Sequence, residues 1–131
     1  MIEIKDLVIN LKDAVIKYPN FTFENKKVYF VKGKNGTGKS ILLKAIADLV
    51  EIEQGIIRSD SIVTYVAQEP YMFDKTVYGN IVYPLKIRKL DISLYEEDIM
   101  KYAKALEIED LLKKNAKNLS SGEKMKVSII R

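Results

Sequence analysis

The octapeptide GKNGTGKS at residues 33–40 constrains this chain more than any other stretch. It comes directly after VYFV (28–31), a β-favouring run between two lysines that predicts a strand buried on both faces. The segment that follows, SILLKAIADLV (40–50), has helical periodicity, with an apolar face made by Leu42, Ile46, Leu49 and Val50. A glycine-rich turn between a buried strand and an amphipathic helix predicts an α/β fold.

The octapeptide fits the spacing G-x-x-x-x-G-K-[ST] of a phosphate-binding loop, or P-loop. Glycines let the backbone turn tightly, so that its N–H groups reach phosphate oxygens and continue into the free donors of the helix start. Lys39 supplies a charge to the β- and γ-phosphates, and Ser40 offers a hydroxyl to Mg²⁺. The predicted nucleotide-binding residues are Gly33, Lys34, Asn35, Gly36, Thr37, Gly38, Lys39 and Ser40.

The alternative for the same residues is a solvent-exposed loop, with glycines at its turns and a lysine for solubility. The P-loop motif requires a strand before it and a helix after it. Both are predicted at these positions, so the sequence favours phosphate binding.

Composition limits the other chemistry that this chain can carry. Its 131 residues include no cysteine and no histidine, which excludes disulfides, thiolate metal sites and a histidine general base. The 22 basic and 18 acidic residues are interspersed and give a net charge of only +4, so we expect no nucleic-acid partner. We find no apolar run of membrane-spanning length and no signal-peptide pattern, and we expect a cytoplasmic chain.

The hydrophobic pattern changes along the chain. Alternating or continuous apolar residues predict strands at 2–9, 21–24, 56–58 and 62–67. Gln68 lies at the end of the last of these strands. Residues 70–118 have a mainly helical pattern, and Ser93 and Glu96 have the spacing of a capping box. Residues 119–131, LSSGEKMKVSIIR, read as the start of a helix with no stop signal, and Ser120 and Glu123 in it also have capping-box spacing. We therefore predict one partial domain over 1–131, with a β-rich edge and P-loop core at 1–68, a helical subdomain at 69–118 and the helix start at 119–131.

Three motifs in this order resemble the ATP-binding cassette (ABC) family of transporter ATPases. Gln68 is similar to the glutamine of the family's Q-loop, and TVYGNI (76–81) is similar to the stretch that follows it. LSSGE (119–123) resembles the family signature LSGGQ. The resemblance covers the whole chain, and its combination with the P-loop is highly specific. It implies an incomplete P-loop NTPase core with an antiparallel β edge and an inserted α-helical subdomain.

The resemblance also implies roles for individual residues. The cofactors would be ATP and Mg²⁺, with Ser40 and Gln68 as the metal-binding residues. Ser120, Ser121 and Gly122 would meet the γ-phosphate of ATP held by a second ATPase subunit, which gives a head-to-tail dimer. The aromatic segment 69–85 is where the family docks its transmembrane permease. The chain would then be a transporter subunit, peripheral on the inner face of the membrane.

Two departures from the family pattern affect the predicted site. Ser121 replaces a usual glycine, and Glu123 replaces a usual glutamine, which places a carboxylate near phosphate unless it caps the helix. The family often stacks adenine on an aromatic side chain, but the corresponding position falls near Asn10 or Leu11. Tyr18 is the candidate for this role, although it lies closer to the P-loop than the family pattern implies.

In the family, the catalytic carboxylates follow the signature helix, and this chain ends at Arg131. We therefore expect the N-terminal portion of a cassette, with an exposed apolar edge, no catalytic residue and at most slow ATP hydrolysis by itself. Two alternatives to a transporter subunit stay open: a non-catalytic nucleotide-binding fragment, and a soluble, non-transport ABC ATPase. The TVYGNI stretch and the lack of long insertions favour transport.

Overall fold

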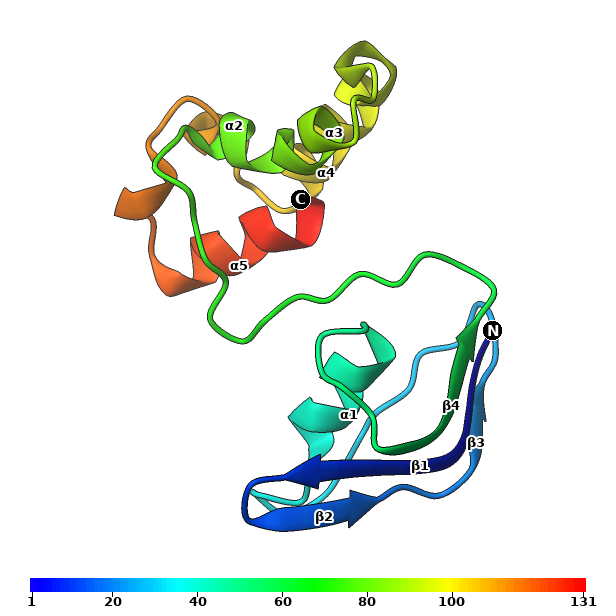
Figure 1. The fold of residues 1–131 in the computed structure, drawn as a ribbon. Helices are drawn as coiled ribbons and strands as arrows, with labels where there is room; N and C mark the ends of the chain where they lie inside the picture. The colour runs from blue at the N-terminus through cyan, green and yellow to red at the C-terminus, as the bar shows by residue number, and fades with distance from the viewer. The chain divides into compact units, whose positions relative to one another are not determined.

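The computed structural model describes all 131 residues and divides them into two compact units, Met1–Tyr65 and Val66–Arg131 (Figure 1). The first unit contains one sheet and one helix, namely β1 (Ile2–Leu11), β2 (Ala14–Lys17), β3 (Phe21–Phe23), α1 (Lys39–Ile46) and β4 (Gln54–Ser59). The second unit is helical, with α2 (Val77–Ile81), α3 (Tyr83–Ile87), α4 (Glu96–Ala105) and α5 (Ser121–Ile130). Three 3-10 turns lie between these helices, at Ile92–Tyr95, Glu109–Leu111 and Ala116–Asn118.

β1 organises the first unit, because it pairs antiparallel with β2, β3 and β4. Three of the predicted strands, 2–9, 21–24 and 56–58, are confirmed by β1, β3 and β4. Ile4 and Leu7 are both buried although they are three positions apart, which would place them on opposite faces of a regular strand. The register shifts between Lys5 and Val8, and Asp6 has a φ of 49°. This bulge reverses the alternation of the strand, so that Leu7 and Ile9 are buried together with Ile4.

Helix α1 covers the sheet and ends earlier than its sequence predicts. Ala45 is buried against Ile4, Leu7 and Ile9. The helix stops at Ile46 because Asp48 adopts a left-handed φ of 56°. The N–H groups of Asp48 and Leu49 then donate to the carbonyls of Ala45 (3.0 Å) and Lys44 (2.8 Å), as in a Schellman motif. Leu49 therefore leaves the predicted apolar face and is exposed.

Two predicted strands, 28–31 and 62–67, are wrong. Neither segment joins a sheet, and the side chains of Val28, Phe30 and Ile62 are 87%, 85% and 84% exposed. A strand that is buried on both faces needs strand neighbours and a covering layer on each side. Residues 28–31 have no strand neighbour; Tyr29 packs edge-on against Phe21 and Phe23, and its hydroxyl accepts the Glu24 N–H. Because 28–31 joins no sheet, its exposed apolar side chains do not form the sheet edge that was expected.

The second unit is built around α2, α4 and α5. α5 packs against both α2 and α4. The shared core contains Val77, Ile81, Ile99, Ala103 and Val127. This arrangement confirms the predicted helical character of the chain after Gln68. None of the helices is both long enough and apolar enough to cross a bilayer.

The predicted capping box at Ser93 and Glu96 is wrong. The carboxylate of Asp91 accepts hydrogen bonds from the backbone N–H of Ser93 at 3.0 Å and from its hydroxyl at 2.8 Å. Asp91 therefore caps the turn Ile92–Tyr95, Ser93 lies inside that turn, and α4 begins only at Glu96. The Glu96 carboxylate instead accepts a hydrogen bond from the Tyr78 hydroxyl at 2.7 Å, which raises the pKa of Tyr78.

Candidate nucleotide-binding site

The predicted P-loop leads directly into α1. Gly38 is the N-cap residue of this helix and has a left-handed φ of 89°, a conformation that favours glycine. No acceptor in the chain bonds the backbone N–H groups of Lys39, Ser40 and Ile41. An eight-residue helix with free N–H groups and the positive end of its dipole at this point favours an anion.

The lysine of the loop is held by the loop's own carbonyl groups. The ammonium of Lys39 donates to the carbonyl oxygens of Gly33 at 2.9 Å and Lys34 at 2.8 Å. The Thr37 hydroxyl also donates to the Lys34 carbonyl, at 2.9 Å. These bonds close the loop around one positive charge. The two carbonyl oxygens are the acceptors that phosphate oxygens would have to replace.

The predicted metal-binding residues lie in different units, Ser40 in the first and Gln68 in the second. Ser40 is exposed in the first turn of α1, with its hydroxyl next to the free N–H groups. Gln68 is exposed in a bend of the second unit and does not end a strand as predicted. No three acidic side chains converge to hold a metal ion. A hydroxyl, an amide oxygen and phosphate oxygens do suit Mg²⁺, which commonly takes few ligands from the protein itself.

The capping box predicted at the start of α5 is confirmed. The Ser120 hydroxyl accepts a hydrogen bond from the Glu123 backbone N–H at 3.3 Å, and the Glu123 carboxylate accepts one from the Ser120 N–H at 2.7 Å. This second bond lowers the pKa of Glu123, and the charges of Lys114 and Lys126 add to the effect. Glu123 therefore caps the helix, the one arrangement in which a carboxylate was expected to be tolerated there.

The other signature residues are open to solvent. Ser121 and Gly122 are exposed in the first turn of α5. A Cβ atom added at Gly122 would meet no atom within 4 Å. The fold of this chain therefore does not require glycine at 122, which leaves close approach by another molecule as a reason for it.

The helix cap at Glu123 should make α5 sensitive to acid. The folded pKa of Glu123 lies below its ordinary value of 4.5, so its contribution to stability is complete above that pH and is lost as the pH falls through the lowered pKa. Glutamine caps in the same geometry without titrating. Between neutral pH and pH values below 4.5, the melting temperature should fall further in the natural chain than in Glu123→Gln. Equal losses in the two proteins would contradict this role.

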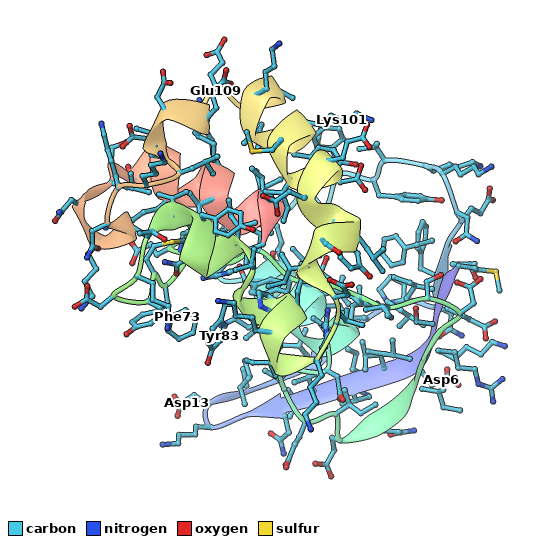
Figure 2. The ribbon with its side chains drawn as sticks, turned by 90° about the horizontal axis from the view of Figure 1, so that it is seen from above. Asp6, Asp13, Phe73, Tyr83, Lys101 and Glu109 are labelled. Atoms are coloured by element: carbon cyan, nitrogen blue, oxygen red, sulfur yellow. The ribbon has the colours of Figure 1, made fainter.

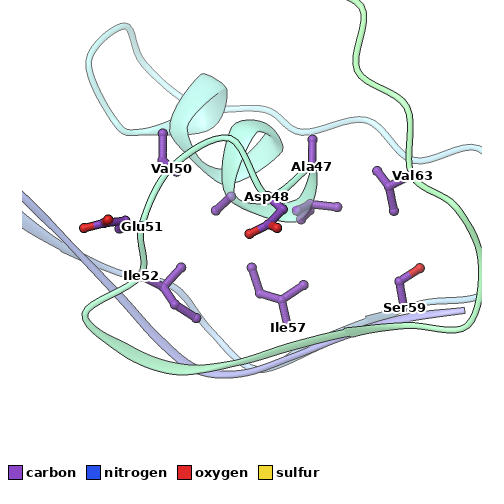
Figure 3. Close-up of a pocket in the computed structure, with 10 residues that line it drawn as sticks. Ala47, Asp48, Val50, Glu51, Ile52, Ile57, Ser59 and Val63 are labelled. Atoms are coloured by element: carbon purple, nitrogen blue, oxygen red, sulfur yellow. The ribbon is translucent and has the colours of Figure 1, made fainter. Parts of the chain in front are cut away.

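A hollow of about 480 Å³ in the first unit is not a phosphate site (Figure 3). It lies beyond the C-terminal end of α1 and is lined by Ala45, Val50, Ile52 and Ile57. The Asp48 carboxylate points into it. A negative charge and the C-terminal end of a helix both disfavour an anion.

Tyr18, the candidate for stacking adenine, is engaged beneath the P-loop. Its hydroxyl donates a hydrogen bond to the Gly38 carbonyl at 2.9 Å, and its ring packs against the core of the first unit. Asn10 and Leu11 belong to β1, and neither is aromatic. Adenine stacking by Tyr18 stays a prediction. The contact with Gly38 was not predicted, because motif spacing does not show which strand lies under a loop.

Comparison with known proteins gives one family. The family model described as ABC transporter matches residues 16–131. The energy-coupling factor transporter ATP-binding protein EcfA1 of Thermotoga maritima is 36% identical over 89% of this chain and 49% of its own length. The tungstate uptake system ATP-binding protein TupC of Peptoclostridium acidaminophilum is 32% identical, over 95% of this chain and 64% of that protein. The chain spans about half the length of the curated relatives that it matches.

Solved structures share the fold. CbiO1 from Clostridium perfringens, part of the ABC transporter complex CbiONQ, matches with a TM-score of 0.76 and 24% identity, over 98% of this chain and 59% of that one. An ATP-binding subunit of an ABC transporter matches with a TM-score of 0.83 and 23% identity, over 98% of this chain and 60% of that one. These likenesses confirm the predicted α/β class with a P-loop NTPase core.

Proposed function

The chain belongs to the ABC transporter family, and on that premise we propose that it binds MgATP as the ATP-binding subunit, or part of the subunit, of a membrane transporter. The observation that carries this proposal is the free N–H groups at the start of α1, with the Lys39 ammonium held over the same loop. Both features favour a polyphosphate.

Each predicted loop residue has a distinct task in this proposal. Backbone N–H groups from Gly36 to Ser40 would bond phosphate oxygens. The Lys39 ammonium would exchange the carbonyls of Gly33 and Lys34 for the β- and γ-phosphates. The Ser40 hydroxyl and the Gln68 amide would hold Mg²⁺, which when bound neutralises charge on the phosphates. The side chains of Lys34 and Asn35 are exposed at the rim of the loop.

Calorimetric titration of the full chain tests the proposal. We expect ATP to bind with one-to-one stoichiometry in the presence of Mg²⁺ and more weakly when the metal is chelated. AMP should bind far more weakly than ATP, because it lacks the phosphates that the loop and Lys39 would hold. AMP and ATP of equal affinity would refute phosphate recognition at this loop.

We further propose that Ser120, Ser121 and Gly122 receive the ATP of a second ATPase subunit in a head-to-tail dimer. Two observations support this. The start of α5 is exposed, and no atom of the chain would clash with a side chain at Gly122. A helix N-terminus with a hydroxyl and a glycine suits the approach of a phosphate.

A Gly122→Ala variant separates folding from pairing. Its melting temperature should be unchanged or slightly higher, because the added methyl group meets open space and alanine favours helix over glycine. ATP binding by its own P-loop should be unchanged. The dimer fraction measured by light scattering with MgATP should fall, because the methyl group blocks close approach. A matched Lys113→Ala change at an exposed position should leave the dimer fraction unaltered. Undiminished dimer in Gly122→Ala would argue against this pairing.

The permease partner would dock on the aromatic segment after Gln68. The rings of Phe73 and Tyr83 lie side by side, 4.2 Å apart between centroids, and Tyr71 meets Phe73 edge-on at 5.4 Å (Figure 2). Tyr71 is 69% exposed, so packing within the helical unit leaves part of this cluster open to solvent. Exposed aromatic clusters suit protein partners. Docking there would place the chain on the inner face of the membrane.

A further inference from the structure

We propose that Tyr18 is a positioning residue of the phosphate loop, whose hydroxyl fixes the Gly38 carbonyl and thereby the orientation of the N–H groups that open α1. The proposal rests on the proposed nucleotide binding and deepens it. It assigns part of the anion affinity to a residue outside the P-loop motif.

Tyr18 links the sheet to the loop through two hydrogen bonds. Its backbone N–H donates to the Leu7 carbonyl of β1 at 2.9 Å, which anchors the residue to the central strand. Its hydroxyl donates to the Gly38 carbonyl at 2.9 Å. The same carbonyl accepts the Leu42 N–H at 2.9 Å, the first bond of the α1 helix. The Gly38 carbonyl oxygen therefore accepts two hydrogen bonds, one from Tyr18, which is anchored to the sheet, and one from helix α1.

Gly38 is enclosed by β2 and Tyr18 rather than by its own loop. It is buried, and an added Cβ atom would lie 2.6 Å from the Tyr18 hydroxyl oxygen and 2.8 Å from Cδ1 of Ile16. A tyrosine hydroxyl is protonated at neutral pH, and partial burial raises the pKa of Tyr18 further, so its hydroxyl is a donor there. The left-handed turn at Gly38 therefore depends on contacts that come from twenty residues earlier in the chain.

The simpler reading is that Tyr18 is a core residue whose ring fills space. The ring does pack with the core of the first unit. The two roles differ in the atom that carries them. Packing uses the ring, which phenylalanine retains, whereas positioning uses the hydroxyl, which phenylalanine lacks. Without the hydroxyl, the Gly38 carbonyl keeps only its helical partner, and the N–H groups of Lys39 and Ser40 sample more orientations before an anion binds.

The test compares Tyr18→Phe with the natural chain, using MgATP and inorganic tripolyphosphate as probes. We expect Tyr18→Phe to bind both about five- to tenfold more weakly, as for the loss of one directed hydrogen bond. The matched control is Tyr29→Phe, which removes a hydroxyl of the same unit that accepts the Glu24 N–H at 2.9 Å. This control should bind both probes with natural affinity.

A second measurement keeps the outcome independent of overall stability. Amide hydrogen exchange of residues 38–41, followed with and without tripolyphosphate, should show weaker protection by the anion in Tyr18→Phe. Unchanged affinity and unchanged protection would overturn the inference. A loss confined to ATP, with natural tripolyphosphate binding, would also overturn it, because Tyr18 would then act on the adenine. If the natural chain binds neither probe, the proposed function itself fails.

Discussion

Replacing Lys39 with alanine should weaken MgATP binding by roughly 10- to 100-fold, because a hydrogen bond to a charged group contributes about 1.5–3 kcal/mol. The fold should survive. Lys39 is only partly buried, and its ammonium bonds two exposed loop carbonyls that water can satisfy instead. Calorimetric titration, with the thermal melt of the free protein alongside, measures both effects.

The control for this prediction is Lys32→Ala, which removes the same charge from an exposed position just before the loop. If the affinity depends on the net charge of the region, both variants lose affinity together. If Lys39 contacts the phosphates, only Lys39→Ala loses it. Natural affinity in Lys39→Ala would remove the basis of the proposed function.

Replacing Asn80 with alanine should destabilise the second unit by about 2–3 kcal/mol. Asn80 is fully buried, and its side chain closes the turn before α2. Its carbonyl oxygen accepts the Phe73 N–H at 2.8 Å, and its amide donates to the carbonyls of Phe73 at 3.1 Å and Thr76 at 3.0 Å. Alanine leaves the Phe73 N–H without its partner, at about 1–3 kcal/mol for a buried group, and adds a small cavity, whereas the two carbonyls keep the N–H groups of Lys75 and Asn80 as donors.

Urea unfolding followed by the helical signal measures this loss. Asn118→Ala is the matched control, because its side chain is exposed and makes no hydrogen bond within the chain. It should change the unfolding free energy by less than about 0.5 kcal/mol. Similar stabilities for the two variants would show that the Asn80 bonds do not hold the turn. In that case the placement of Phe73 for a partner would need another explanation.

Local patterns predicted most of the secondary structure. Alternation identified β1, β3 and β4, helical periodicity identified α1, and the spacing of Ser120 and Glu123 predicted the cap of α5. Each of these signals lies within a few consecutive residues. β2 was missed because Ala14–Lys17 is too short for alternation to stand out. The end of α1 depends on the left-handed turn at Asp48, which periodicity does not indicate.

The wrong predictions concern burial that depends on other parts of a fold. Residues 28–31 and 62–67 have β-favouring composition, but composition does not supply a pairing strand. The Ser93 capping box failed because Asp91 caps a turn that contains Ser93, and α4 begins only at Glu96. A sequence motif states which groups are available. It does not state which neighbouring groups they bond in the folded chain.

The site was predictable as far as its motifs extend. The P-loop spacing identified the residues at the start of α1, and the signature identified the residues at the start of α5. Contacts between distant positions were not predictable in the same way. The hydroxyl of Tyr18 on Gly38 and the amide of Asn80 on Phe73 appear only once the chain is folded.

The closed arrangement of Lys39 has a consequence for the entropy of nucleotide binding. A free lysine side chain loses up to about 2 kcal/mol of rotamer entropy when it is fixed. Here the ammonium is already fixed by the Gly33 and Lys34 carbonyls before a ligand arrives. Binding then exchanges one set of oxygen acceptors for another, so the entropic penalty of immobilisation falls on folding and not on association. The loop behaves as a preorganised receptor.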